Sequence, residues 1–124
     1  MITRRSMPGS SSARISRLVT LAALLGVVAC STAVVRPEPR DAKWASERWP
    51  GTTVDELSRG RDLFVARCAG CHNLPRPDIK TPDEWANVVD EMASGARLSS
   101  GDRDLVLRYL SAASERLHRE GHAG

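Results

Sequence analysis

From Thr53 onward the apolar residues recur at the spacing of α-helices in three stretches, and no stretch shows the sustained alternation of a strand. Each stretch begins at a residue that can cap a helix, namely Thr53, Thr81 and Ser99. The first two starts, Thr-Val-Asp-Glu and Thr-Pro-Asp-Glu, are capping boxes, in which the Thr hydroxyl and the Glu side chain bind backbone N–H groups of the first turn. The sequence therefore predicts an all-α domain.

Each predicted helix has one apolar face. These faces consist of Leu57, Phe64, Val65 and Cys68 in the first helix, of Trp85, Val88, Val89 and Met92 in the second, and of Leu105, Val106, Tyr109, Leu110, Ala113 and Leu117 in the third. Gly60 lies within the first face, where it costs about 1 kcal/mol relative to Ala unless another helix crosses closely there; a tolerated surface glycine is the alternative. We expect the second helix to stop at Gly95 and the residues after Leu117 to fray.

The three helices hold few large apolar side chains. The chain has one Phe and one Tyr, and domains of about 70 residues often need a staple or a cofactor to be stable. The sequence therefore indicates that something besides its own side chains stabilises this domain.

The first 29 residues resemble a signal peptide. Residues 1–17 are basic and residues 18–29 form an uncharged apolar run, well short of the ~20 residues that a transmembrane helix needs. The run ends at Val-Val-Ala-Cys, which resembles the lipobox of bacterial lipoproteins, where the cysteine is lipidated and becomes the mature N-terminus. We predict a signal peptide over 1–29 and lipidation of Cys30; cleavage after Ala29 without lipidation and an uncleaved anchor are the alternatives. Ser31 resembles the residue found in lipoproteins sent to the outer membrane.

Residues 30–52 are predicted to be a tether between the lipid and a domain over 53–121, because they contain three prolines and no sustained apolar period. Such a tether would let the domain move up to about 75 Å from the membrane. We expect Trp49 to fold back onto the domain and Trp44 to be the more exposed of the two.

The distribution of charge excludes nucleic acid as an expected partner. Four of the 18 Lys and Arg residues and none of the 15 Asp and Glu residues precede residue 30, so the rest of the chain carries a formal charge of −1 instead of +3. Binding to nucleic acid depends on clustered positive charge.

Residues 68–72, Cys-Ala-Gly-Cys-His, form the C-x-x-C-H sequence to which haem is covalently attached in c-type cytochromes. The two thiols at this spacing reach both vinyl groups of one porphyrin, and the imidazole of His72 then lies beneath the iron. A zinc site, with His118 and His122 as further ligands, and a redox dithiol are the alternatives. Export favours haem, because haem of this type is attached outside the bacterial cytoplasm.

The chain resembles the small bacterial monohaem class I c-type cytochromes, in particular short lipoprotein-like ones. The resemblance rests on residues 60–72, Gly-Arg-Asp-Leu-Phe-Val-Ala-Arg-Cys-Ala-Gly-Cys-His, continues through Trp85 and Met92, and covers about residues 49–113. It implies short helices wrapped around one haem c, bound by Cys68, Cys71 and His72. It also implies that the helix before the motif crosses the C-terminal helix.

The resemblance further implies a Met as the second axial ligand of the iron. Met92 is the only Met after the signal peptide, so we expect His72 and Met92 to be the metal ligands. A core role for Met92, His118 or His122 as the ligand, and an open site are the alternatives. By the same resemblance, the carbonyl of Pro75 or Pro77 would orient His72. Arg76 and Lys80 could pair with the haem propionates, and Trp85 could pack on the macrocycle or in the core.

These expectations point to a one-electron carrier on the periplasmic side of the bacterial cell envelope, tethered by lipid to the outer membrane, with redox proteins of the envelope as partners. No residue is expected to be catalytic. The alternatives are a cytochrome subunit of a dehydrogenase complex, a haem sensor, or a peroxidase-like enzyme whose sixth ligand can be displaced.

Overall fold

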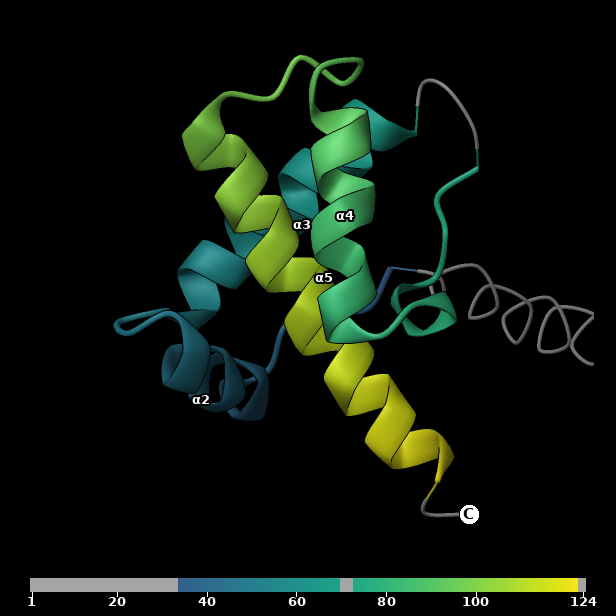
Figure 1. Ribbon diagram of the computed structural model, residues 1–124. Helices are drawn as coiled ribbons and strands as arrows, with labels where there is room; N and C mark the ends of the chain where they lie inside the picture. The colour runs from purple at the N-terminus through teal and green to yellow at the C-terminus, as the bar shows by residue number, and fades with distance from the viewer. Residues whose placement is uncertain (1–33, 70–72, 123–124) are drawn as a thin grey trace, which may run out of the picture. The chain divides into compact units, whose positions relative to one another are not determined.

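Four α-helices and one short 3₁₀ helix make up the part of the chain that the computed structural model describes, residues 34–69 and 73–122 (Figure 1). The helices are α2 (Pro39–Arg48), α3 (Val54–Cys68), η1 (Pro77–Ile79), α4 (Pro82–Ala93) and α5 (Ser100–Gly121). These residues contain no strand, which confirms the predicted all-α class. None of the helices in them is long and apolar enough to cross a membrane. The signal peptide, Cys30, Cys71 and His72 lie outside the described residues.

The predicted helix starts are confirmed. The Thr53 hydroxyl accepts from the Glu56 N–H at 3.2 Å while the Glu56 carboxylate accepts from the Thr53 N–H at 3.0 Å. The same box caps α4, where the Glu84 carboxylate lies 2.7 Å from the Thr81 N–H. The Ser99 hydroxyl caps α5. Because the groups of each cap are three residues apart, the sequence predicts these starts without knowledge of the rest of the fold.

One predicted helix end is confirmed and one is wrong. Helix α4 ends at Ala93 and is capped by Ser94, so it stops directly before Gly95, as predicted, although the left-handed residue of the turn that follows is Arg97, with φ 53°. Helix α5 continues past Leu117 to Gly121. Its last turns are held by tertiary contacts, in particular by the ion pairs that Arg116 makes with residues before and within α2, and no local pattern reports such contacts.

Helices α3 and α5 cross with their backbones in contact at Gly60, as predicted. A Cβ atom at this position would collide with the carbonyl of Leu105 and lie 3.0 Å from the Cβ of Tyr109. One turn further along α3, the ring of Phe64 packs on Tyr109 at a centroid distance of 6.1 Å. The glycine inside the apolar face is therefore explained by the close approach of the two helices.

The main core lies between α3, α4 and α5. It contains most of the predicted apolar faces, namely Phe64, Cys68, Trp85, Val89, Val106, Tyr109, Leu110 and Ala113. A second, smaller cluster joins α2 to the crossing helices through Ala45, Leu57 and Ala112.

The predicted tether is wrong for residues 39–48, which form α2 and pack on the domain. Ala45 is fully buried in this contact, and Trp44 and Trp49 are both half-buried, with a ring centroid distance of 6.5 Å. The prediction for Trp49 is therefore confirmed, but Trp44 is covered as well. The helix is polar along most of its length, but Ala42, Ala45 and Trp49 lie at helical spacing on the face that packs on the domain, and Pro39 is its first residue. The sequence therefore carried a signal for α2 in this short apolar face and in the proline at its start.

Candidate functional site

A small apolar cavity lies between α3, α4, α5 and the segment before η1. Its lining consists of apolar and sulfur-containing residues: Phe64, Cys68, Pro75, Trp85, Val88, Val89, Met92, Ala96, Leu98, Val106 and Leu110. None of these side chains carries a carboxylate, an amine, a guanidinium or an imidazole. Among the described residues, the lining of the cavity is therefore apolar and offers no charged group to a ligand.

Cys68 lies at one end of this cavity. It is the last residue of α3 and is 7% exposed. Its position follows from the crossing at Gly60, because that contact fixes α3 against α5 two helical turns earlier. Of the motif residues, the structure thus places Cys68 at the cavity, while Cys71 and His72 lie outside the described residues.

Met92 lies in the last turn of α4, is half-buried, and lines the same cavity. It shares this face with Trp85, Val88 and Val89, as the sequence predicts. The structure therefore brings together Cys68 and Met92, two of the four residues that were expected to bind the cofactor, from two different helices.

Trp85 fastens the segment after the motif to α4. Its side chain is 2% exposed, and its indole N–H donates to the carbonyl of Pro77 at 2.8 Å. The Pro77 carbonyl is therefore engaged with Trp85, whereas Pro75 lines the cavity. The helical period predicts that Trp85 is buried, but it carries no signal for the hydrogen bond, because the acceptor is a backbone group of an irregular segment.

Arg76 and Lys80, the two residues considered for the haem propionates, contact other groups of the chain, Arg76 through its side chain and Lys80 through its backbone carbonyl. The guanidinium of Arg76 binds the carboxylate of Asp78 through Nε at 2.9 Å and Nη2 at 2.7 Å. This pair lowers the pKa of Asp78 and raises the pKa of Arg76. The Lys80 carbonyl accepts from the buried Ser114 hydroxyl at 2.5 Å, which holds the loop on α5.

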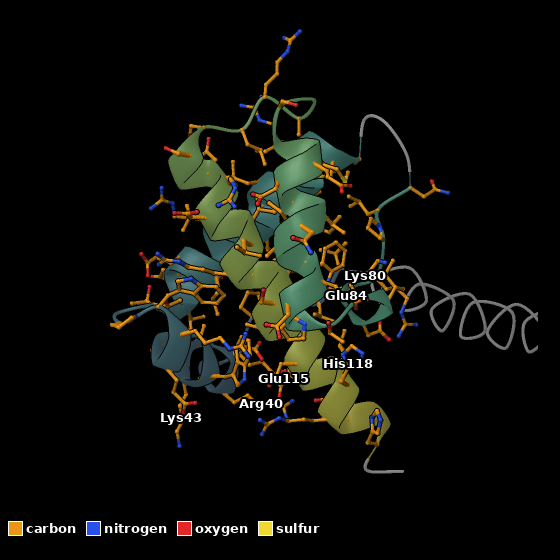
Figure 2. The ribbon with its side chains drawn as sticks, in the orientation of Figure 1. Arg40, Lys43, Lys80, Glu84, Glu115 and His118 are labelled. Carbon is orange, nitrogen blue, oxygen red and sulfur yellow. The ribbon has the colours of Figure 1, made fainter. Side chains whose placement is uncertain are left out.

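His118 lies in the last turn of α5 and His122 is the residue that caps its end, and neither of them lines the cavity. Figure 2 shows His118 beside Lys80 and Glu84, at the start of α4. Met92 is eight residues beyond Glu84, about 12 Å along the helix axis. The described residues contain no cluster of three His, Cys, Asp or Glu side chains that could hold a metal ion. Neither histidine therefore shares a site with Cys68 in the part of the chain that the structure describes.

The residues that line the cavity have the chemistry to surround a porphyrin, but the cavity itself is too small to hold one. Apolar side chains surround it, a cysteine is available for a thioether bond and a methionine for an axial ligand. The cavity has a volume of about 20 Å³, which is room for about one water molecule. A porphyrin would occupy the site only if α4 and the segment around Pro75 lie further apart.

A larger hollow, of about 310 Å³, lies between α2 and α5. Arg40, Arg116 and Arg119 line it together with Asp41, Glu115 and Glu120; Figure 2 shows Arg40 and Glu115 there. These charges neutralise one another: Arg40 pairs with Glu120, Arg116 with Asp41, and Arg119 with Glu115. The hollow therefore has no unmatched charge that would select a ligand.

No family model, curated protein or solved structure matches this chain. Its function therefore has to follow from its own residues.

Proposed function

We propose that this protein is a one-electron carrier with one haem c, attached through Cys68 and Cys71 and with His72 and Met92 as axial ligands. The observation that supports this most is that Cys68 and Met92 line one apolar cavity although they belong to different helices. When bound, the haem supplies an iron that alternates between Fe(II) and Fe(III). All other properties of the site come from the chain.

The cavity residues suit this role in four ways. Their apolar side chains keep water away, and a neutral thioether ligand such as Met92 favours the ferrous state, so both raise the reduction potential. The Trp85–Pro77 hydrogen bond holds the segment that leads away from His72. We propose that the carbonyl of Pro75 or Pro77 accepts from the His72 imidazole; the Pro77 carbonyl also accepts from Trp85, which leaves it one further lone pair.

The chemistry of the lining supports a carrier rather than an enzyme. An enzyme that acts on a peroxide needs a group that moves protons at the distal side. The described residues that line the cavity include no carboxylate, imidazole, amine or guanidinium. Together with the lipobox at Cys30, this supports a carrier in the bacterial cell envelope that exchanges electrons with other redox proteins.

The attachment of haem is tested by intact mass after acid-acetone extraction of protein produced in the periplasm with the haem-attachment machinery. We expect one haem per chain to remain bound in the wild type and none in the double variant Cys68→Ala/Cys71→Ala. A wild-type protein that releases its haem, or carries zinc instead, would contradict the proposal.

The role of Met92 as the second axial ligand of the iron is tested by Met92→Ala, with Val88→Ala as the control. Val88 lines the same cavity one turn earlier on α4, so its truncation removes a similar contact without removing a sulfur. We expect only Met92→Ala to abolish the ferric methionine-to-iron charge-transfer band, lower the potential and let carbon monoxide bind. If the two variants have the same spectrum as the wild type, Met92 is an ordinary core residue.

A further inference from the structure

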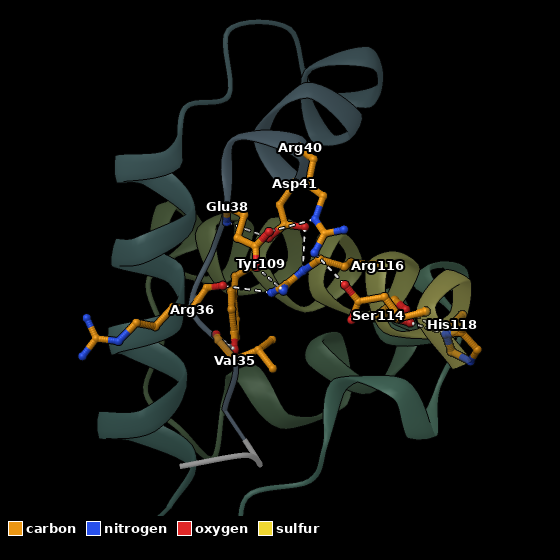
Figure 3. A network of polar contacts seen from close by, with 10 residues as sticks. Val35, Arg36, Glu38, Arg40, Asp41, Tyr109, Ser114, Arg116 and His118 are labelled. Atoms are coloured by element: carbon orange, nitrogen blue, oxygen red, sulfur yellow. Dashed lines mark hydrogen bonds and ion pairs between the residues drawn. The ribbon is translucent and has the colours of Figure 1, made fainter. Parts of the chain in front are cut away.

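Residues 34–38, which we call the strap, lie bound across α3 and α5 ahead of α2. The Val34 carbonyl accepts from Nε and Nη2 of Arg61 on α3, both at 3.4 Å. The Val35 carbonyl accepts from the hydroxyl of Tyr109 on α5 at 2.9 Å (Figure 3). The side chains of Val34 and Val35 also pack against the main core. The start of the strap is therefore attached to both crossing helices.

The other end of the strap is held by Arg116, whose side chain is 9% exposed. Its guanidinium donates to the Arg36 carbonyl at 2.9 Å and to the Glu38 carboxylate at 2.7 Å, and its Nε lies 3.0 Å from the carboxylate of Asp41 (Figure 3). Asp41 is buried and also accepts from the Glu38 N–H at 2.8 Å. Both ends of the strap are thus bound to the domain.

This attachment leaves little free chain next to Cys30. Only Ser31, Thr32 and Ala33 separate Cys30 from Val34. Four steps of extended chain reach at most about 14 Å, compared with the roughly 75 Å that a tether up to Thr52 would allow. Cys68 lies seven residues beyond Arg61 on α3, about 10 Å along the helix axis. Allowing for the Arg61 side chain and its contact with the Val34 carbonyl, Cys68 stays within about 35 Å of Cys30.

We infer that a chain lipidated at Cys30 holds its domain against the membrane surface, and that its electron partner is a redox protein embedded in that membrane. The inference rests on the lipidation and the haem proposed above. A long tether would let the domain reach partners anywhere within its radius. The bound strap instead raises the effective concentration of partners whose redox centre lies at the membrane surface and lowers that of more distant ones.

The placement is tested by inserting 20 Gly and Ser residues between Ala33 and Val34 and placing the lipidated protein on a supported bilayer. Such an insert adds a root-mean-square reach of about 25 Å. Neutron reflectometry should find the wild-type protein layer in contact with the headgroups, and the insertion variant in a more distant and more diffuse layer. The same 20 residues added after Gly124 are the control, which should leave the layer where the wild type has it.

Whether the haem reaches an electron donor in the membrane is tested in vesicles with two reductants. A long-chain quinol confined to the bilayer gives one electron to each of two haems and releases two protons, whereas ascorbate reduces the haem from water. We expect the insertion before Val34 to slow reduction by the quinol several-fold, and to leave reduction by ascorbate unchanged.

The outcomes distinguish a failure of this inference from a failure of the proposed haem or of the proposed lipidation. Equal layer positions, or equal quinol rates, for the wild type and the insertion variant would overturn it even if haem and lipid are both present. An intact mass without lipid would overturn both the role of Cys30 and the placement. A visible spectrum without haem would overturn the proposed carrier, whereas reflectometry would still decide the placement of the domain.

Discussion

Two sides of this domain are held together by different forces, although both pack on α5. The cavity side consists of the parts of α3, α4 and η1 near the apolar cavity, and the strap side consists of residues 34–38 and α2. Around the cavity the contacts are apolar, and the indole of Trp85 makes the buried side-chain hydrogen bond that joins α4 to η1. Around the strap, polar groups of Arg61, Tyr109 and Arg116 hold backbone carbonyls and carboxylates of residues far away in the sequence. The cavity side is held mainly by hydrophobic burial, whereas the strap side adds paired polar groups to the apolar packing of Val34 and Val35.

The difference indicates that the packing of the cavity side can adjust, whereas the polar contacts of the strap side cannot change without a loss of stability. Apolar contacts have no fixed direction, so the walls of the cavity can separate around a bound group while they stay buried. Buried polar groups must keep their partners or lose free energy. Burial of Asp41 raises the pKa of its carboxyl, although the Glu38 N–H and the Arg116 guanidinium both act to lower it. The strap side is therefore expected to unfold as a unit when one of its partners is removed.

Arg116→Ala should have the largest effect, because it leaves the carboxylate of Asp41 buried without its cation. We expect a loss of about 3 kcal/mol in the free energy of unfolding at neutral pH, measured by urea denaturation. The loss should become smaller as the pH falls toward the ordinary aspartate pKa of about 3.9, because burial raises the pKa of Asp41 above that value and a protonated carboxyl no longer needs a cation. Arg119→Ala is the control: Arg119 is 72% exposed in its pair with Glu115, so its loss should cost less than about 0.5 kcal/mol. Similar values for the two variants would show that the strap contributes little to stability.

Gly60→Ala tests the helix crossing that supports both sides. The added methyl group would collide with the backbone of Leu105, so the helices must move apart at a cost of about 2 to 3 kcal/mol. Gly101→Ala is the control, since nothing lies within 4 Å of a Cβ at this position on α5, and it should leave stability equal or slightly higher. Thermal unfolding followed by circular dichroism measures both, and an unchanged Tm in Gly60→Ala would mean that the crossing is looser than the structure shows.

Trp85→Phe tests the hydrogen bond from the Trp85 indole to the Pro77 carbonyl. It keeps an aromatic ring in the core but removes the donor to the buried segment at Pro77, which should cost about 1 to 2 kcal/mol. Amide hydrogen exchange should show faster exchange over residues 76–80, with α3 unaffected. If exchange is unchanged there, the loop is held by packing alone.

The smallest effect is expected at the exposed pair of Arg76 and Asp78. The pKa of Asp78 is lowered by Arg76, so its contribution is present above the unfolded pKa of about 3.9 and is lost as the pH falls through the folded pKa. Asp78→Asn should therefore cost at most about 0.5 kcal/mol at pH 7 and nothing near pH 2. Urea denaturation at both pH values measures this, and an effect comparable to that of Arg116→Ala would contradict the contrast between exposed and buried pairs.

The sequence by itself determined the features that depend on neighbouring residues. The capping groups of Thr53 and Thr81 are three residues from their partners, and the apolar faces of α3, α4 and α5 follow from the helical period. Gly60 also predicted the crossing, because a glycine within an apolar helix face destabilises the helix unless a second helix approaches closely there. That Met92 is on the cavity face of α4 also followed from its spacing to Trp85 and Val88.

Only the tertiary structure decided where the polar groups of distant segments meet. The bond from Tyr109 to Val35 and those from Arg116 to Arg36 and Glu38 join residues 74 to 80 positions apart. Such a bond leaves no period in the sequence, because a backbone carbonyl is the same at every residue and an arginine on a helix is more often exposed than buried. For this reason the sequence predicts a tether where the strap is bound, and the short reach from Cys30 follows only from the fold.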